Sequence, residues 1–190
     1  MITSTTQRIQ QLTRSGSWGN DTLHGMLAQH ARSRPQHLAI KDQPNREQLT
    51  GTPPLALTWA ELDWASESLA CQLQSQGIGE DDRLIAQLPN ITELVVVYYA
   101  ASKIGAILSP IPVQYGSHEL RLMADTLGAT GVITLNRFRE NDLAATARRA
   151  LPQIKAMLRR ERILSILRPG LGKKMACLHH GTGEAEIYLE

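Results

Sequence analysis

The spacing of hydrophobic residues predicts a long amphipathic helix in the first half of the chain. Thr58 and Glu61 form a capping box, in which each side chain bonds a free backbone N–H at the helix start. Gly77 occupies the position where a left-handed residue commonly ends a helix. The helix is therefore expected from about Thr58 to Gln76, with an apolar side formed by Leu62, Ala65, Leu69 and Leu73.

Shorter periodic segments flank this helix on both sides. Further helices are predicted over Thr22 to Ser33, over Thr92 to Ile104 and from Ser117, the expected cap, to Gly128. Apolar runs that are short enough for buried strands cover His37 to Lys41, Arg83 to Leu88, Ala106 to Ile111 and Val132 to Leu135.

The order of these segments predicts the fold class. The polar stretch from Asp42 to Pro54 is rich in Pro, Gly and Asn and is expected to be a loop. After it, helices and strands alternate with short connections, which is typical of parallel strands joined by right-handed crossovers. We therefore expect an α/β fold in which helices cover both faces of a parallel sheet.

Composition narrows the functional classes. The chain has 190 residues, 42% of them hydrophobic and 20% charged, which suits a folded domain. A net charge of +2 and 4% aromatic residues give no reason to expect a nucleic-acid partner. Its most apolar stretch, Leu94 to Ala101, is much shorter than the roughly 20 residues of a membrane span. Only two cysteines, Cys71 and Cys177, are present and no secretory leader is visible, so a cytoplasmic location is expected.

Charge is unevenly distributed along the chain. Residues 137–174 contain 11 basic and 3 acidic residues, a local charge of +8. Met157 to Leu167 keeps helical apolar spacing, whereas the sequence from Pro169 onward loses it. We divide the chain into a flexible N-terminus (1–20), an α/β unit (21–155) and a divergent basic helix with a partly disordered or irregular tail (156–190).

Three motifs resemble the start of the AMP-forming adenylating enzymes, the superfamily that includes acyl-CoA synthetases. Leu57 to Leu62 resembles the family's first core motif, LTYxEL. Gly77 to Asn90 resembles the stretch GVGxGDRVAxxLPN around a strand, and Glu93 to Pro112 resembles the second core motif, ELVVAYLAxLKAGAVxVPxNP. Each motif is mainly structural, but together they follow the family's order and spacing. Within the family, Pro112 to Leu120 is more similar to acid:CoA ligases, because it lacks the Asp-Pro pair of peptide-synthetase domains.

The resemblance implies a two-step ligase reaction, and this chain lacks some of the motifs that the reaction requires. In the family, a carboxylic acid attacks ATP to form an acyl adenylate, and a thiol, usually coenzyme A, then takes the acyl group. The resemblance implies ATP, Mg²⁺ and coenzyme A for the full-length enzyme. The phosphate loop of the family is rich in Ser, Thr and Gly and ends in Pro-Lys. Residues 1–190 contain no such loop. We therefore expect an N-terminal fragment that is inactive alone, with no catalytic, cofactor-binding or metal residue.

Other candidate sites have simpler explanations. Pro169 to Lys174 is rich in Gly and Lys but lacks the hydroxyl residues of a phosphate loop, and Gly181 to Gly183 is followed by acidic residues. Cys177, His179 and His180 do not have zinc-finger spacing. His24, His30 and His37 do not have the spacing of a helical metal pair and are expected at the surface or its boundary.

Two interaction hypotheses stay open beside the ligase. The basic segment Arg148 to Lys174 could make the chain a non-catalytic interaction module. A truncated parallel sheet would also leave an unpaired edge and uncovered apolar helix faces such as Leu94 to Tyr99. Self-association through the sheet edge is therefore expected.

Overall fold

The computed structural model describes residues 4–167, 175–177 and 187–189. Its centre is a four-stranded parallel sheet in the order β4-β3-β5-β8. Leu84 of β3 lies opposite Leu108 of β4 and Gly131 of β5, and Val132 of β5 lies opposite Met157 of β8. The strands are β3 (Arg83–Gln87), β4 (Ile107–Pro110), β5 (Gly131–Thr134) and β8 (Ala156–Arg159).

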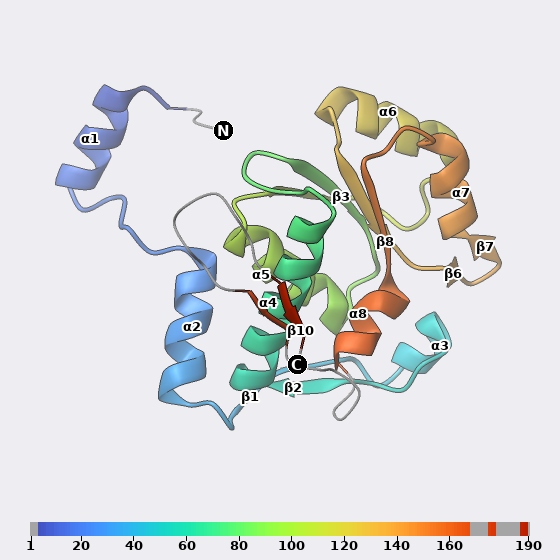
Figure 1. The fold of residues 1–190 in the computed structure, drawn as a ribbon, viewed down its shortest axis with the longest axis horizontal. Coiled ribbons are helices and arrows are strands. Elements are labelled where there is room, and N and C mark those ends of the chain that lie inside the picture. The colour runs from blue at the N-terminus through green and yellow to red at the C-terminus, as the bar shows by residue number, and fades with distance from the viewer. Residues whose placement is uncertain (1–3, 168–174, 178–186, 190) are drawn as a thin grey trace.

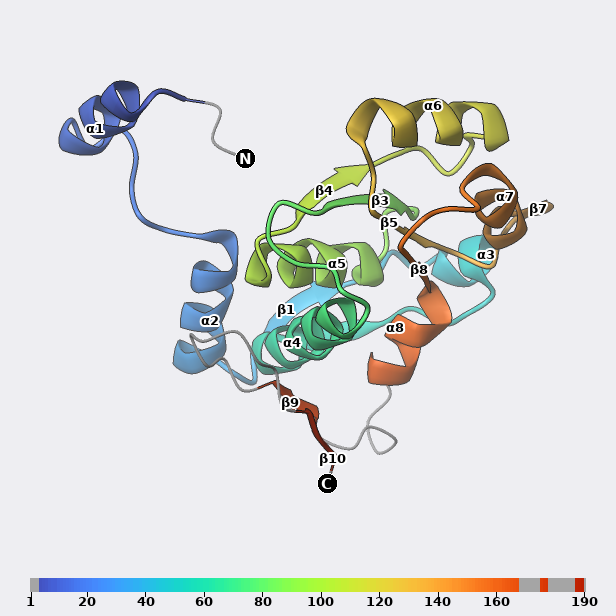
Figure 2. The same cartoon turned by 45° about the horizontal axis from the view of Figure 1, so that its top comes forward.

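Helices cover both faces of this sheet (Figures 1 and 2). One face carries α4 (Trp59–Ser75) and α5 (Thr92–Lys103), with α8 (Arg160–Leu167) and α2 (Leu23–Ser33) packed against them. The other face carries α6 (Ser117–Leu127) and α7 (Leu143–Ala150). The α/β fold class expected from the sequence is confirmed.

The two helical layers bury separate hydrophobic clusters. The larger cluster lies between the sheet and the α4 and α5 layer and includes Leu69, Leu84, Val97, Ile133 and Leu158. The smaller cluster lies under α6 and α7 and includes Ile85, Leu120, Val132 and Ala147. Neighbouring strand residues such as Leu84 and Ile85 thus enter opposite clusters, as the alternation of side chains along a strand requires.

Smaller elements surround the sheet. Helix α1 (Thr6–Arg14) buries no residue and stands apart from the body (Figure 1). Two-stranded antiparallel sheets join β1 (Leu38–Lys41) to β2 (Ala56–Thr58), β6 (Arg137–Phe138) to β7 (Asn141–Asp142), and β9 (Met175–Cys177) to β10 (Ile187–Leu189).

The capping box opens α4 as predicted. Thr58 Oγ1 accepts a hydrogen bond from the Glu61 N–H at 3.3 Å, and Glu61 Oε2 accepts one from the Thr58 N–H at 2.8 Å. The C-cap of α4 is Gln76, and Gly77 follows in the left-handed region with φ +77°. At the start of α6, however, the N-cap is Gly116, and Ser117 is the first helical residue.

Two sequence-based expectations were wrong in detail. The expected loop from Asp42 to Pro54 contains the helix α3 (Arg46–Thr50), because Arg46 points inward to buried carboxylates. The helix expected over Met157 to Leu167 begins only at Arg160, and residues 156–159 form a strand that pairs with β5. Ala156 and Leu158 enter one cluster while Met157 packs against the other, which is the period of a strand. The basic segment therefore begins as a strand of the central sheet.

The sequence candidates in the tail lie outside the described residues. These are the Gly-Lys run at residues 169–174, the side chains of the run at residues 177–180, and the glycines at 181 and 183. In the part of the chain that the structure describes, no group of three His, Cys, Asp or Glu side chains could hold a metal ion.

Removing the α4 cap should destabilise the fold measurably. Thr58→Ala leaves the Glu61 N–H without its side-chain acceptor, and we expect the free energy of unfolding to fall by about 1 kcal/mol. Thr126→Ala is the matched control, because Thr126 is exposed inside α6 and bonds only a carbonyl of its own helix, Leu122 O, at 2.7 Å. Urea unfolding followed by circular dichroism measures both. Equal stability of the two variants would contradict the role given to the cap.

Candidate functional site

The carboxyl ends of the parallel strands form the candidate site. In open α/β sheets, ligands bind outside these ends, where the order of the strands reverses. Here the chain passes from β3 to β4 on one side and then returns to place β5 on the other side of β3. The reversal therefore lies between Gln87, which ends β3, and Thr134, which ends β5.

Buried polar side chains gather at these strand ends. Gln87 is fully buried and donates from Nε2 to the carbonyl oxygen of Tyr115 at 2.9 Å, which ties the segment before α6 to the end of β3. Thr134 Oγ1 is also buried and lies 3.4 Å from the Gln87 carbonyl oxygen, to which it donates. Gln87 Oε1, Asn136 Oδ1 and Arg160 Nε are among the described atoms that are buried without a hydrogen-bond partner. Buried polar atoms without a hydrogen-bond partner are rare in folded proteins. Their presence shows that the interior of the protein is polar at this edge of the sheet.

A buried ion cluster lies beside this edge. Arg46 Nη1 and Nη2 donate to Glu93 Oε2 and Oε1 at 2.8 and 2.6 Å, a two-point pair between α3 and the first turn of α5. Arg46 Nη1 also bonds Asp42 Oδ2. Asp42 Oδ1 in turn accepts from the backbone N–H and the hydroxyl of Thr92, both at 2.8 Å. The Arg46 and Glu93 side chains are fully buried. This network fixes the polar segment after β1 to the start of α5.

Arg160 joins the cluster from the end of β8. Its side chain is 7% exposed, and its Nε lies 4.0 Å from Glu93 Oε1. Arg160 Nη1 donates to Thr52 Oγ1 at 3.3 Å, and Arg46 Nη2 donates to the same oxygen at 3.2 Å. The four ionisable side chains, Asp42, Arg46, Glu93 and Arg160, sum to zero formal charge. Arg46 is bonded to both carboxylates, whereas the Nε of Arg160 is buried without a hydrogen-bond partner.

Burial and hydrogen bonding oppose each other in setting the pKa of these groups. Burial raises the pKa of the Asp42 carboxyl, but hydrogen bonds from Leu55, Thr92 and Arg46 outweigh it and bring that pKa below its ordinary value. Burial would lower the pKa of Arg46, yet the bonds and charges of Glu93 and Asp42 raise it. The pKa of Arg160 is lowered, chiefly by burial and also by the nearby Arg46, against the opposing effect of Glu93 and Glu161.

The sequence candidates are scattered in the structure. His24 Nδ1 lies 3.0 Å from Ser102 Oγ, and the His30 ring lies 4.6 Å from that of Trp59, so these histidines contact different partners. Glu61 serves the cap as expected. Sequence reasoning missed Asp42 and Arg46 because they sit in a polar stretch that predicts a solvated loop. Asp42 lies before α3 and not within it, so the contact between these two residues does not follow from helical spacing in the sequence.

The fold and this edge define an open α/β protein with a reversal of strand order at the carboxyl ends of its parallel strands. Comparison with known sequences assigns the family: the profile of the AMP-binding enzymes matches residues 27–176, and the chain belongs to this family. The match extends through β8, past the limit of residue 155 that the sequence motifs suggested.

Curated relatives include several kinds of adenylating enzyme. The chain is 32% identical over 126 residues to phosphinothricin tripeptide synthetase PhsC of Streptomyces viridochromogenes, covering 64% of this chain and 11% of that one. It is 28% identical over 160 residues to the medium-chain fatty-acid–CoA ligase of Escherichia coli, covering 83% of this chain and 27% of the relative. It is 33% identical over 119 residues to salicyl-AMP ligase of Mycobacterium tuberculosis, covering 63% and 20%. The chain thus spans less than a third of each of these relatives.

Solved structures show the same fold. The apo structure of Mycobacterium smegmatis MbtA superposes with a TM-score of 0.68 at 23% identity, covering 92% of this chain and 32% of that one. The N-terminal domain of FACL13 from Mycobacterium tuberculosis gives 0.61 at 18% identity, covering 90% and 44%. Among the described helices, none is long and apolar enough to cross a membrane.

Breaking the buried ion cluster should cost more than breaking a surface pair. Arg46→Met leaves Glu93 and Asp42 buried without their cation, and we expect the free energy of unfolding to fall by about 3–5 kcal/mol. Arg137→Met is the control: Arg137 lies 3.6 Å from Glu140, and both side chains are largely exposed, so this change should cost at most about 1 kcal/mol. Denaturant unfolding of the two variants measures both losses in the free energy of unfolding. A loss for Arg46→Met no larger than the control would show that the cluster contributes little.

The same cluster predicts a sign for the acid dependence of stability. The folded-state pKa of Asp42 lies below its unfolded value, so its stabilisation is present above the unfolded pKa of about 3.9 and disappears as pH falls through the folded pKa. Asp42→Asn should therefore be less stable than wild type at neutral pH and lose less stability on acidification. Unfolding free energy measured against pH tests this, with the exposed Asp125→Asn as control. Parallel acid profiles for wild type and Asp42→Asn would refute it.

Proposed function

We propose that this chain is the amino-terminal part of an ATP-dependent acid:CoA ligase that forms an acyl adenylate and then an acyl thioester. The observation that carries the proposal is the family match across residues 27–176, which spans the whole parallel sheet and its polar carboxyl edge. The sequence from Pro112 to Leu120 favours acid:CoA ligases over peptide synthetases. A carboxylic acid, ATP and coenzyme A are then the partners of the full-length enzyme.

We assign none of the described residues to the ATP and Mg²⁺ that such a reaction requires. Charge on a transferring phosphoryl group is held by backbone amides, a lysine and a metal ion. Here Arg46 is already paired with Asp42 and Glu93, and Arg160 lies beside Glu93, whereas Arg159 at the end of β8 is exposed. The sequence contains no Ser/Thr/Gly-rich loop that ends in Pro-Lys. We therefore propose that residues 1–190 alone do not catalyse the reaction, and no step is assigned to them.

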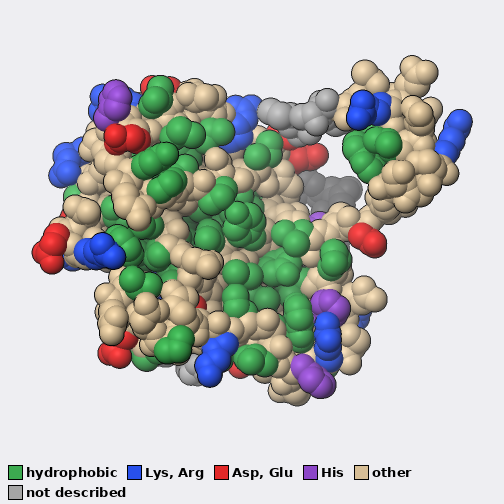
Figure 3. Space-filling model, turned by 180° about the vertical axis from the view of Figure 1, so that it is seen from behind, with side chains coloured by type: hydrophobic (Ala, Val, Ile, Leu, Met, Phe, Trp, Pro, Cys, Tyr) green, Lys and Arg blue, Asp and Glu red, His purple; other side chains and the backbone are tan. Residues whose placement is uncertain are grey.

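The surface supports the view that this part of the fold packs against further protein. Hydrophobic side chains reach the surface in the middle of the face shown in Figure 3. Along α5, Leu94, Val95 and Tyr99 are only half-buried and Tyr98 is 37% exposed. A contiguous apolar face on a small protein often marks an interaction surface.

A second candidate is a non-catalytic interaction module that uses the basic C-terminal segment. Arg148, Arg149 and Arg159 are exposed, which favours it. Arg160, from the same segment, is buried against Glu93 and serves the fold. The ligase fragment accounts for more of the chain, so we prefer it.

Pyrophosphate exchange tests the proposed inactivity. The purified 190-residue chain, ATP, Mg²⁺ and labelled pyrophosphate are incubated with a panel of aliphatic and aromatic acids. We expect no acid-dependent label in ATP, because the sequence contains no Ser/Thr/Gly-rich loop that ends in Pro-Lys. The medium-chain fatty-acid–CoA ligase of Escherichia coli, assayed in parallel, shows that the conditions support exchange. Exchange above background with any acid would overturn the proposed inactivity and identify the acid class.

A further inference from the structure

The two edges of the central sheet differ in their ability to pair with another strand. Ile107 N donates to Asp82 O at 2.8 Å and Ile111 N to Ala86 O at 3.0 Å, so alternate residues of β4 face β3. The residues between them, Leu108 and Pro110, turn their backbone groups outward. Pro110 has no N–H to donate, and proline is a common device for blocking an exposed edge.

The β8 edge has no such block. Ala156 N donates to Thr130 O at 3.2 Å, and the parallel register then turns Ala156 and Leu158 toward β5. Met157 and Arg159 therefore turn their N–H and C=O groups away from the sheet. Among the turns, loops and caps of the described residues, no backbone hydrogen bond uses them on that side, although the Arg159 carbonyl oxygen, directly before α8, also accepts the first bond of that helix. The β8 edge thus offers donors and acceptors in alternation over the length of the strand.

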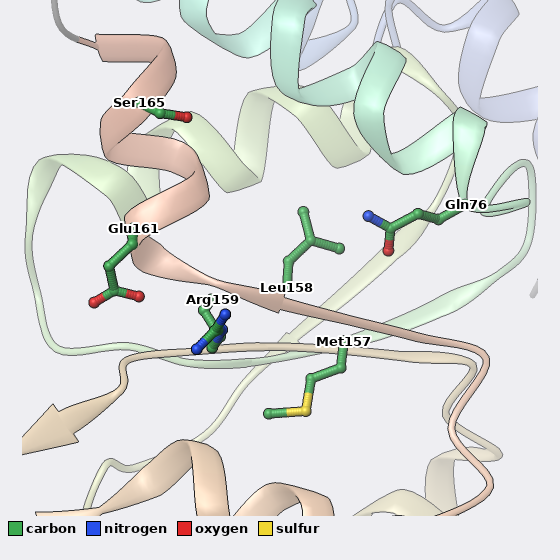
Figure 4. A pocket seen from close by; sticks show the side chains of 6 residues that line it. All are labelled: Gln76, Met157, Leu158, Arg159, Glu161 and Ser165. Atoms are coloured by element: carbon green, nitrogen blue, oxygen red, sulfur yellow. The ribbon is translucent and has the colours of Figure 1, made fainter.

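A groove lies along this open edge (Figure 4). Its volume is about 480 Å³, and it is bounded by Gln76 at the end of α4, by β8 and by the first two turns of α8. Leu158 points from β8 toward the helical layer, whereas Met157 points to the opposite side of the strand. The lining residues are Gln76, Met157, Leu158, Arg159, Glu161 and Ser165.

We propose that a second copy of this chain docks here, with the two β8 strands antiparallel about a two-fold axis at Leu158. A symmetric pair formed by one strand must be antiparallel. Outward-facing residues must also meet outward-facing residues for the hydrogen bonds to form. Met157 of one copy then lies opposite Arg159 of the other, in two equivalent hydrogen-bonded pairs. Both side chains lie on the α7 side of the sheet, because residues two apart on a strand share a face.

The charged side chains favour this register over the two registers in which the two-fold axis lies one residue earlier or later. Moving the axis to Met157 would set Lys155 opposite Arg159, and moving it to Arg159 would set the two Arg159 side chains opposite each other. Like charges directly opposite destabilise a strand pair. With the axis at Leu158, each Arg159 meets the neutral Met157, and the Lys155 end of one strand runs toward the Glu161 end of the other. Of the three registers, this one alone places no two like charges of the segment Lys155 to Glu161 directly opposite each other.

The proposed result is a continuous eight-stranded sheet with β8 and its copy at the centre. The two Leu158 side chains would lie side by side at the axis, on the α4 face, each near a Gln76. Strand addition of this kind takes its affinity from backbone hydrogen bonds and its specificity from alternate side chains. The inference concerns the surface of this chain and is independent of the proposed ligase function.

Three substitutions of Met157 test the register, because they place a neutral, a positive or a negative side chain opposite Arg159 of the other copy. Met157→Gln is the reference, because it replaces the half-buried methionine with a neutral polar side chain of similar length. Met157→Lys puts a positive charge opposite Arg159 of the other copy and should raise the dimer dissociation constant about tenfold relative to Met157→Gln. Met157→Glu puts a negative charge there and should lower it. Analytical ultracentrifugation of the full chain over a dilution series measures the constants, and circular dichroism checks that all three variants fold.

Amide hydrogen exchange gives a second readout on the unmodified chain. The Met157 and Arg159 amides should gain protection as concentration rises, whereas the Ala156 and Leu158 amides should be protected throughout. A wild-type chain that stays monomeric at every soluble concentration would overturn the proposal. So would a dimer whose stability does not distinguish Met157→Lys from Met157→Glu, since it would use another surface or another register. Capture of an unrelated protein at this edge by a monomeric chain would equally count against the second copy.

Discussion

The buried pair between Arg46 and Glu93 is the interaction on which the arrangement around the sheet depends. A charge without a partner is costly in a protein interior, so the two side chains must meet in one geometry or leave the core. Their meeting joins the segment between β1 and β2 to the first turn of α5. Arg160 approaches the same carboxylate from the end of β8, so one buried anion relates three segments that are distant in the sequence. This geometry explains why a polar stretch of 13 residues, 42–54, is held against the body.

The same cluster limits what the strand ends can do. In an open α/β protein the carboxyl edge is where a ligand's charge would be held, and here Arg46 is neutralised by Asp42 and Glu93. The buried polar atoms there that lack a partner are the amide oxygens of Gln87 and Asn136 and the Nε of Arg160. Arg159, which ends β8, adds an exposed cation to this edge.

Local signals predicted most of the sheet and its helices, because each was set by neighbouring residues. The capping box at Thr58 and the glycine after α4 act within a few residues of themselves, and both hold in the structure. By contrast, α3 owes its place to Glu93, some 47 residues away, which no local pattern reveals. Strand β8 was missed for a related reason. Leu158 and Ile163 have helical spacing in the sequence, but pairing with β5 decides the conformation of residues 156–159. The polar carboxyl edge of the sheet could likewise not be predicted from the sequence, because it forms only when the ends of separate strands meet.

Pro110 has a consequence for how far strand addition can proceed. A sheet with two open edges can add copies without limit, and the product is a fibre rather than a defined particle. Because the β4 edge lacks a donor at Pro110, a copy that pairs through β8 leaves only two blunted edges at the ends of the joined sheet. Assembly by this route would be self-terminating. A single proline on the opposite side of the sheet would thus protect the chain from open-ended polymerisation.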